Sequence, residues 1–450
     1  MPVKLTDNDT IAAIATPPGN GGVGIIRISG SLVTAISQQL IHKVLQPRQA
    51  IYSAFFDADD SIIDSGISLY FPAPASYTGE DILELQGHGG SVVLDMLLRR
   101  VLALGARLAN PGEFTERAFL NNKMDLAQAE AVADLIESST EQSARSAQKS
   151  MQGVFSAQIN ELVEELTELR IYVEAAIDFV DEEIDFLTDG VVENRILRLL
   201  EKILKIHKTA QQGRLLRDGM TVVLAGKPNA GKSSLLNALA GHEAAIVTDI
   251  AGTTRDVLRE RIQLDGMPLH VIDTAGLRES DNAIEKEGIR RAHQEIQKAD
   301  LILLLIDVNE PETEDLLTSL PTNIKIIKVY NKIDLAGRVP EIQQTENGTH
   351  CYLSIKTGAG LDLLKQHLKQ SVGFNEATDH VFIARRRHIE AISKGYEFVE
   401  SALNQLQTIQ AGELVAEDLR QAQNSLAEIT GQFTSDDLLG KIFSSFCIGK

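Results

Sequence analysis

Four short polar motifs between residues 226 and 334 have the types and the order expected of a site for a guanine nucleotide. The first reads GKPNAGKS and covers 226–233, and the pair Thr253–Thr254 follows it. The third, DTAG, covers 273–276, and the fourth, NKID, covers 331–334. Each motif handles a different part of one ligand, so we do not attribute their joint presence to chance. The sequence therefore predicts a domain that binds GTP.

The first motif stands between a strand-like run, 221–225, and a helical pattern that begins near Leu235. This is the context that a phosphate-binding loop requires. Its glycines let backbone amides wrap the phosphates, while Lys232 brings a positive charge to the β- and γ-phosphates. The Ser233 hydroxyl, at the start of the helix, is the expected ligand of Mg²⁺.

Base selection is expected to depend on Asn331 and Asp334. The Asp334 carboxylate can accept hydrogen bonds from N1–H and the exocyclic amine of guanine, whereas adenine has an acceptor at N1 and would leave the carboxylate unpaired. The site should therefore take GTP rather than ATP. The run Ser354-Ile355-Lys356 follows a strand-like stretch and looks like the loop that completes such sites on the base side.

The hydrolytic machinery departs from that of Ras-like proteins. Leu277 stands where a polar residue would orient the attacking water, so another group must act. We favour Glu285, an acid in the polar stretch 280–287, together with Lys232 and Asp273. The alternative is that Glu285 only begins the following helix, since acids are common in a first helical turn.

Asn229 places an amide oxygen inside the phosphate-binding loop. Together with carbonyl groups from a following loop, this oxygen could hold a monovalent cation. A bound K⁺ would supply positive charge where an arginine finger acts in other GTPases, a role worth on the order of a thousandfold in rate. We therefore expect GTP turnover to depend on potassium.

Composition sets the class of protein. A chain of 450 residues with 43% hydrophobic content suggests about three domains. The longest apolar run, 301–306, is too short to span a bilayer and the start of the chain is polar, so we expect a soluble cytoplasmic protein without a signal peptide. The two cysteines, Cys351 and Cys447, are far apart in sequence, which argues against a disulfide framework or a zinc site. The ending CIGK does not fit a prenylation signal.

The formal net charge of −20 argues against indiscriminate binding of nucleic acid. Local basic patches remain. One is a helical stripe, for which a solvated face is the favoured interpretation, and it consists of Arg195, Arg198, Lys202, Lys205 and Lys208. The cluster RRRH at 385–388 begins another helix, and contact with RNA is an open alternative there.

The order of patterns along the chain predicts an insertion, and the expected fold class is α/β plus all-α. Residues 1–120 alternate short apolar runs with helical patterns and indicate a mixed α/β domain. Residues 121–217 and 378–450 are helical, with one long apolar stripe between Ile159 and Ile177 that is typical of a bundle. The nucleotide domain, 218–377, interrupts them, so the two helical segments should pack together.

Two glycine-rich runs need separate treatment. The run 19–24 matches a dinucleotide fingerprint literally, but the strand-like Ile25 to Ile28 follows it, whereas that fingerprint must open a helix. We therefore reject it. The run QGHGG at 86–90 holds one histidine among glycines with no obvious metal partners, and a structural turn is the favoured interpretation.

The whole chain resembles the MnmE (TrmE) family of tRNA modification GTPases. The most specific pieces are TPPG at 16–19, LQGHGG at 85–90, PGEF at 111–114, GTTRD at 252–256 and the ending FCIGK. The resemblance implies an N-terminal domain that binds a tetrahydrofolate and dimerises, a helical domain, and an inserted Ras-like G domain.

The resemblance also implies partners and a reaction. With an FAD-containing partner, MnmG (GidA), in a heterotetramer, the homodimer would attach an aminomethyl-type group to C5 of the wobble uridine of certain tRNAs. The one-carbon unit would come from 5,10-methylene- or 5-formyl-tetrahydrofolate. Two G domains would approach each other in the GTP state, and no membrane is involved.

The resemblance assigns site residues as follows. Folate would be bound by Arg27, Glu84, Lys123 and Lys450, with individual roles left open. Mg²⁺ would be held by Ser233 and Thr254, and K⁺ by Asn229, Thr248, Ile250 and Thr253. GTP would contact Asn229, Ala230, Gly231, Lys232, Ser233, Ser234, Thr248, Thr254, Asp273, Thr274, Ala275, Gly276, Asn331, Lys332, Asp334, Ser354, Ile355 and Lys356.

Two other classes are weighed against this one. A ribosome-assembly GTPase would normally bring an RNA-binding module or a second G domain, and neither is visible. A dynamin-like membrane remodeller predicts a basic or apolar membrane-contact segment, which this acidic chain does not show.

Overall fold

A computed structural model gives the fold of the chain. It describes residues 9–178, 190–240, 259–273, 297, 299–310, 321, 324–345, 348–374, 381–409, 411–432 and 436–449. The chain divides into two compact units. One comprises Met1–Ala133, Met151–Arg170 and Leu419–Lys450, and the other comprises Asp134–Ser150 and Ile171–Asp418.

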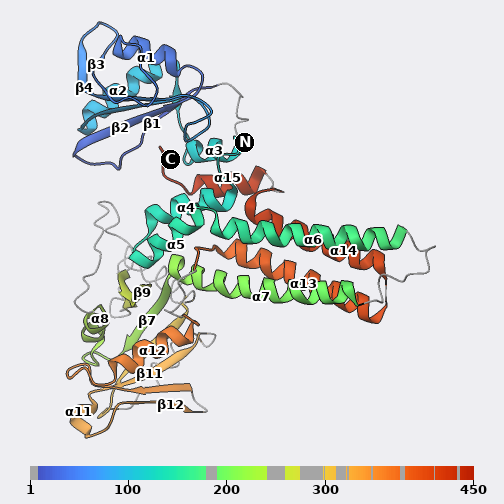
Figure 1. Cartoon of the computed structure of the whole chain (residues 1–450). Helices are drawn as coiled ribbons and strands as arrows, with labels where there is room; N and C mark the ends of the chain where they lie inside the picture. Colours follow the sequence, from blue (N-terminus) through green and yellow to red (C-terminus); the bar gives the residue numbers. More distant parts are fainter. Residues whose placement is uncertain are drawn as a thin grey trace. The chain divides into compact units, whose positions relative to one another are not determined.

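The first unit contains a six-stranded sheet in the order β3-β4-β5-β2-β1-β6. Neighbouring strands are antiparallel except for the short parallel pair of β1 and β6. The strands are β1 Ile11–Ile14, β2 Gly21–Ser29, β3 Ile51–Phe56, β4 Ile62–Phe71, β5 Ile82–Gly89 and β6 Arg107–Leu108. This confirms the mixed α/β fold expected for the N-terminal part (Figure 1).

Helices α1 (Val33–Ile41) and α2 (Ser91–Ala103) cover one face of this sheet. Alternate residues of β2 and β5, such as Ile26, Ile28 and Leu85, meet them in a buried core, as the period of two in a strand requires. The short helix α3 (Glu113–Leu120) places the fully buried Phe114 with Ile11 and Ala13 of β1. The opposite face of β2 and β5 therefore presents Arg27 and Glu84.

The same unit contains α15 (Asp436–Ser444) and the larger part of α4 (Leu126–Glu137), which share an apolar cluster that includes Leu126, Ile442 and Phe443. Helices α6 (Val154–Asp178) and α14 (Gly412–Thr430) contribute residues to both units. The stripe predicted on α6 is confirmed, because Ile159, Leu162, Leu166, Leu169 and Val173 are buried.

The run QGHGG was expected as a turn, and this expectation is wrong, because residues 86–89 form the end of strand β5. The glycines serve close approach within the sheet. A Cβ at Gly87 would lie 2.4 Å from the Asp64 carboxylate, and one at Gly89 would lie 2.5 Å from the carbonyl oxygen of Gly21. His88 Nδ1 and Asp64 Oδ1 are 2.7 Å apart.

The second unit contains a seven-stranded sheet in the order β12-β13-β11-β10-β7-β9-β8. The central strands are parallel, and the edge pairs β8–β9 and β12–β13 are antiparallel. The strands are β7 Met220–Gly226, β8 Arg259–Leu264, β9 Met267–Asp273, β10 Leu301–Asp307, β11 Ile326–Asn331, β12 Glu341–Thr345 and β13 Gly348–Tyr352. The central strands are continuous apolar runs, as parallel strands buried on both faces require.

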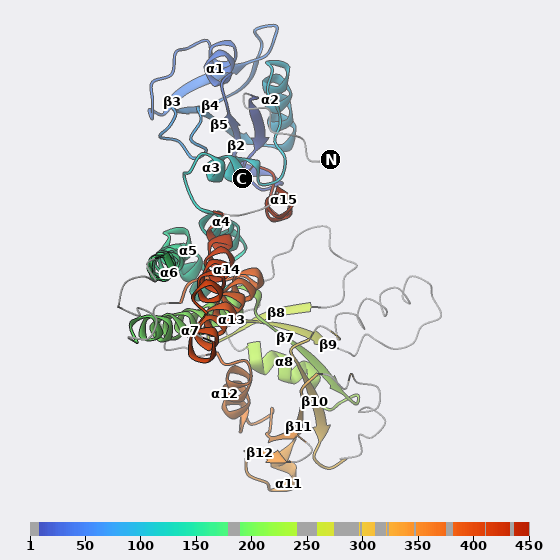
Figure 2. The same cartoon turned by 90° about the vertical axis from the view of Figure 1, so that its right-hand side faces the viewer.

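Helices α8 (Lys232–Ala240) and α12 (Leu361–Ser371) pack on one face of this sheet, and α11 (Ile333–Ala336) is a single turn. The helical part of the unit includes α5 (Glu141–Met151), α7 (Val191–Asp218) and α13 (Arg386–Thr408), with the ends of α4 and α6 and the start of α14. Figure 2 shows α12 and the strands from the side. No helix within the described ranges is long and apolar enough to cross a membrane.

One carboxylate joins the chain segments that precede and follow the seven-stranded sheet. Asp134 Oδ1 accepts hydrogen bonds from Arg217 Nε at 2.7 Å and from Arg385 Nη2 at 2.8 Å, and its side chain is 3% exposed. Arg217 belongs to the last turn of α7, and Arg385 is the N-cap of α13. A Cβ at Gly213 would lie 1.8 Å from the Phe382 carbonyl oxygen, so the incoming and outgoing segments touch.

Candidate functional site

The phosphate-binding loop runs from the end of β7 at Gly226 to the start of α8 at Lys232. Three of its residues have positive φ, namely Gly226 at 151°, Asn229 at 64° and Gly231 at 108°. A Cβ at Gly231 would lie 2.6 Å from Asn331 Nδ2. The glycine there is therefore required both by backbone conformation and by space.

The ammonium group of Lys232 lies against the loop. Lys232 Nζ donates to the carbonyl oxygens of Gly226 at 3.0 Å and Lys227 at 3.2 Å, which holds the ammonium group along the loop. Ser233 and Ser234 are exposed in the first turn of α8, where backbone amides lack partners within the helix. A helix start with an adjacent ammonium group attracts phosphate, and a hydroxyl beside it is a suitable oxygen ligand for Mg²⁺.

Asn331 joins the phosphate side of the site to the base side. Its Nδ2 donates to the Ala230 carbonyl oxygen at 2.9 Å, and its Oδ1 accepts from the Ile355 amide at 3.1 Å. The residue is 4% exposed. The sequence predicts that Asn331 contributes to base selection, but it does not predict this contact between two loops.

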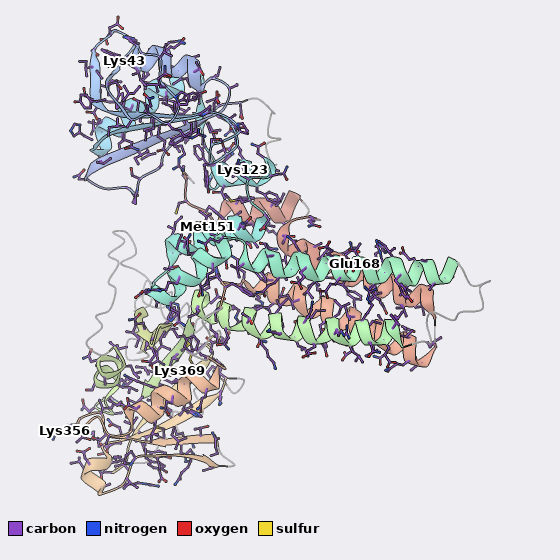
Figure 3. The ribbon with its side chains drawn as sticks, in the orientation of Figure 1. Lys43, Lys123, Met151, Glu168, Lys356 and Lys369 are labelled. Atoms are coloured by element: carbon purple, nitrogen blue, oxygen red, sulfur yellow. The ribbon has the colours of Figure 1, made fainter. Side chains whose placement is uncertain are left out.

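Asp334, the predicted base-side group, is exposed at the start of α11. Its Oδ1 accepts a hydrogen bond from the buried Ser354 hydroxyl at 2.6 Å. The Ser354 amide donates to the Ala359 carbonyl oxygen at 2.9 Å, which closes the loop that carries Ile355 and the exposed Lys356, labelled in Figure 3. Residues 331–334 and 354–356 therefore meet along one edge of the sheet.

Lys332 has a partner that the motifs did not reveal. Its Nζ lies 2.6 Å from Asp307 Oδ2, across the adjacent strands β10 and β11. The hydrogen bond from Lys332 lowers the pKa of the Asp307 carboxyl below its ordinary value. The signal in the sequence was the position of Asp307 directly after the apolar run 301–306, because the carboxyl ends of parallel strands meet at one edge.

Several predicted residues fall beyond the described ranges. They are Thr248, Ile250, Thr253, Thr254, Thr274, Ala275, Gly276, Leu277, Glu285 and Lys450. Asp273 is described by its backbone alone. It ends β9 opposite Leu224 of β7, two residues before the phosphate-binding loop.

A second candidate site lies on the sheet of the first unit. Arg27 and Glu84 face each other in the register of β2 and β5, with Arg27 Nε and Nη2 each 3.0 Å from Glu84 Oε1. The rings of Tyr77 and Phe114 lie 5.7 and 5.8 Å from the guanidinium carbon. Arg27 Nη1 also donates to the Gly449 carbonyl oxygen at 3.3 Å, so the end of the chain reaches this pair.

Lys123 lies near the same loop but does not touch the pair. Its Nζ donates to the Pro74 carbonyl oxygen at 2.9 Å, in the segment that leads to Tyr77. The side chains of Arg27 and Glu84 are 23% and 15% exposed. They are thus accessible, and they can exchange partners with a charged ligand.

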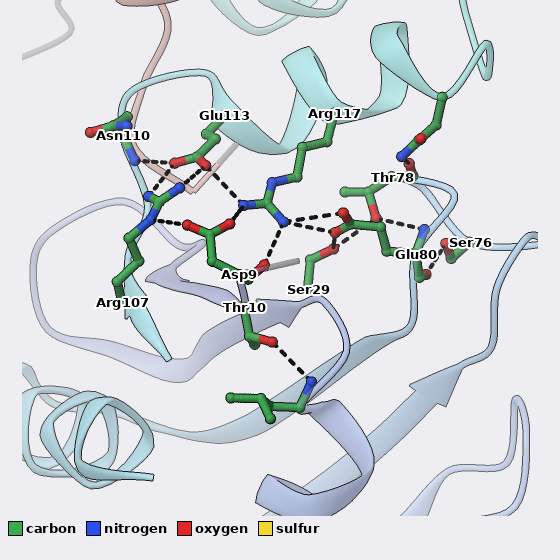
Figure 4. Close-up of polar contacts among 12 residues, drawn as sticks. Asp9, Thr10, Ser29, Ser76, Thr78, Glu80, Arg107, Asn110, Glu113 and Arg117 are labelled. Carbon is green, nitrogen blue, oxygen red and sulfur yellow. Dashed lines mark hydrogen bonds and ion pairs between the residues drawn. The ribbon is translucent and has the colours of Figure 1, made fainter. Parts of the chain in front are cut away.

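Figure 4 shows an ion network in the same unit, centred on Glu113 and Arg117. Glu113, which is fully buried, accepts from Arg107 Nη1 at 2.8 Å and from Arg117 Nη2 at 3.0 Å. Arg117 also reaches Asp9 Oδ1 at 2.6 Å and both oxygens of Glu80 at 3.1 Å. The network fixes α3 on the sheet and hence the Phe114 ring beside Arg27.

The two cysteines have different surroundings. Cys351 is buried in the second sheet, and burial raises the pKa of its thiol to about 12, so it is unreactive at neutral pH. Cys447 is exposed, and its carbonyl oxygen accepts from the Gly112 amide at 3.3 Å.

Known proteins similar to this one match it along nearly its whole length. The family model described as "MnmE helical domain" matches residues 126–447, and the model described as "GTP-binding protein TrmE N-terminus" matches residues 10–123. The chain is 58% identical over 451 residues to the tRNA modification GTPase MnmE of Hydrogenovibrio crunogenus, with 100% of both chains covered. It is 59% identical to that of Histophilus somni strain 129Pt, covering 98% of this chain and 99% of the relative.

Among solved structures, the G domain of the T. maritima FeoB iron transporter is 30% identical to this chain. The match covers 34% of this chain and 98% of that one, with a TM-score of 0.27. Overlap at that score is too small to say anything of function.

Proposed function

The chain belongs to the MnmE family of tRNA modification GTPases, and on that premise we propose that it hydrolyses GTP to drive modification of the wobble uridine in certain tRNAs. The observation that carries the GTPase part is the Asn331 bridge between the phosphate-binding loop and the base-side loop. Through it, Lys232 and Asp334 belong to one ligand site. The Asp334 carboxylate then selects guanine, because its free lone pairs match the two donors of that base.

Cations are expected at two positions. Ser233 and Thr254 would hold Mg²⁺, which supplies charge neutralisation at the β- and γ-phosphates. Asn229, Thr248, Ile250 and Thr253 would hold K⁺. The described part of this set fits, since Asn229 is exposed within the loop at a φ of 64° and offers a neutral oxygen of the kind that alkali ions take. Glu285 would assist the attacking water, because Leu277 has no polar atom.

A one-carbon carrier would occupy the second site. Arg27, Glu84, Lys123 and Lys450 would bind 5,10-methylene- or 5-formyl-tetrahydrofolate. A carboxylate at Glu84 can accept from donors of the pterin, and the cations can meet the glutamate tail. The partial exposure of the Arg27–Glu84 pair supports this assignment.

The assembly is proposed to be a homodimer that joins the FAD-containing partner MnmG (GidA) in a heterotetramer and acts on tRNA in the cytoplasm. Residues 1–120 would bind folate and dimerise, 121–217 and 378–450 would form the helical domain, and 218–377 the G domain. Two G domains would approach in the GTP state and separate after phosphate release. A scattering profile that is the same with GDP and with GDP and aluminium fluoride would contradict this motion.

Two experiments test the proposal. GTPase rates in matched sodium and potassium buffers should differ by on the order of a thousandfold if K⁺ takes the place of an arginine finger. Equal rates would remove the potassium site. Mass spectrometry of wobble-uridine nucleosides from cells lacking this chain should show loss of the C5 group, whereas unaltered nucleosides would favour a role in ribosome assembly.

A further inference from the structure

Helix α7 has a local charge opposite to that of the whole chain. It holds seven Lys and Arg residues and three Asp and Glu residues, although the formal net charge of the chain is −20. Helix α6, by contrast, holds six Asp and Glu residues and one Arg. A concentrated positive field on an acidic protein attracts polyanions to one place.

The cations of α7 fall into two sets. Arg195 and Lys202 have contacts of their own, such as the ring of Tyr172, which lies 6.0 Å from the Arg195 guanidinium. Arg198, Lys205 and Lys208 are exposed, and no ion pair engages them within the part of the chain that the structure describes. We call these three residues the basic stripe.

The packing of α7 leaves the basic stripe on its outer side. The apolar side of the helix, with Leu199, Ile203 and Ile206, is buried. Helix α13 runs antiparallel along α7, as contacts at both ends indicate: Gln407 Nε2 donates to Glu193 at 2.7 Å, and Ser393 Oγ lies 3.2 Å from His207 Nε2. Arg217 and Arg385 of the two helices meet at Asp134.

The basic stripe is long enough to meet more than one phosphate. Arg198 and Lys205 are two helical turns apart and so lie one above the other, and the span from Arg198 to Lys208 is about 15 Å. Leu197 and Leu204 beside them are 46% and 42% exposed. Glu201 is also exposed on this side and reduces the local charge.

We propose that the basic stripe on α7 is a docking surface for the phosphate backbone of the tRNA substrate. The inference rests on the proposed function, which supplies the RNA. Exposed ammonium and guanidinium groups contact phosphates without reading bases, so the stripe contributes affinity and orientation rather than the choice of tRNA. RNA is favoured over an acidic protein because it carries a charge at every nucleotide along its length.

The first test compares two triple variants of the full chain that lose the same charge. One is R198Q/K205Q/K208Q, and the control is K43Q/R99Q/K441Q, at exposed positions on other elements. The probe is an in vitro transcribed tRNA with uridine at the wobble position, and its affinity is measured at several salt concentrations. The stripe variant should bind about tenfold more weakly near 0.15 M salt, and its log–log salt slope should fall by about two to three. The control should keep the wild-type slope, and both should keep the wild-type GTPase rate.

A second test does not depend on removing charges. A photo-reactive amino acid replaces Leu204 beside the stripe, or Leu335, which is 67% exposed on α11, as the control. Irradiation with labelled tRNA should give a cross-link from position 204 and none from position 335.

The outcomes separate the stripe from the proposed function. Equal tRNA binding by the two triple variants, or cross-links from both positions, would overturn the stripe alone. A wild-type chain that binds no tRNA, together with unaltered wobble nucleosides in cells lacking it, would overturn both. Weakened binding of the FAD-containing partner with tRNA binding retained would assign the stripe to a protein instead.

Discussion

The nucleotide loops and the Arg27–Glu84 pair position their polar groups in different ways. Around the nucleotide site, loops at the ends of parallel strands are held by single hydrogen bonds, such as those of Asn331 and Ser354. Arg27 and Glu84 instead project from the middle of an antiparallel sheet.

In the same unit, a network of arginines and carboxylates around the buried Glu113 orients α3. Substitutions in the first region should therefore act on ligand binding one contact at a time. Substitutions in the network should act first on folding. A polar group can therefore be held in place by hydrogen bonds between loops in one region and by ion pairs around a buried carboxylate in another.

The largest effect is expected from Asp334→Asn, which tests the loop region. An amide presents a donor to the guanine amine, so GTP affinity should fall by about a thousandfold, while xanthosine triphosphate, which has an oxygen there, should bind better. Nucleotide titration of the purified protein measures both. Asp362→Asn, an exposed acid on α12, is the matched control, and equal losses in the two variants would contradict the assignment of the base contact.

Glu113→Gln tests the network. Its removal leaves Arg107 and Arg117 without their buried carboxylate, so the free energy of unfolding of the first unit should fall by about 3 kcal/mol. Native-state proteolysis that follows N-terminal fragments measures this, and GTP affinity should not change. Glu116→Gln on the same helix is the control, because burial raises the pKa of Glu116 and its charge is not stabilised. Equal destabilisation by both would mean that the ion pairs contribute nothing special.

Ser354→Ala sharpens the comparison from the loop side. It removes one hydrogen bond to an exposed carboxylate, so GTP affinity should fall by about fivefold, close to 1 kcal/mol. Ser371→Ala, whose hydroxyl donates only within α12, should leave the affinity as it is. A loss as large as that of Asp334→Asn would show that Ser354 has a larger part than positioning.

Acid should weaken the ion network around Glu113. This loss of stability is the smallest of the expected effects. Burial of itself raises the pKa of Glu113, but hydrogen bonds from Arg107, Asn110 and Arg117 lower it below the ordinary value of 4.5. The stabilisation is then complete above pH 4.5 and is lost as the pH falls through the lowered value of the folded state. At pH 4.5 the loss should be about 0.4 kcal/mol, and it should be absent in Glu113→Gln. Proteolysis at a series of pH values measures it, and a stability that rises with acid would give the opposite sign.

Local patterns predicted the phosphate-binding loop and the elements on either side of it. The strand, loop and helix around Gly231 and the apolar stripe of α6 could be read from spacing, because each depends on neighbours in the sequence. The Asn331 bridge could not, because it joins segments far apart in the chain. For the Asp307–Lys332 pair, the sequence offered only the position of Asp307 after an apolar run. The ion network of Asp9, Glu80 and Glu113 was not predicted, because its members are also far apart in the chain. The prediction of a turn at QGHGG was wrong because glycine also occurs in strands where another segment approaches closely.

The contacts of Asp134 with Arg217 and Arg385 have a mechanical consequence for the nucleotide-binding part of the second unit. A domain hung on one linker can swing and spin, whereas this one is attached by two neighbouring chain segments that touch at Gly213 and Phe382. Two neighbouring attachment points allow rotation about the line that joins them, and they resist rotation about other axes. A rearrangement at the nucleotide site would then be passed to α7 and α13 together.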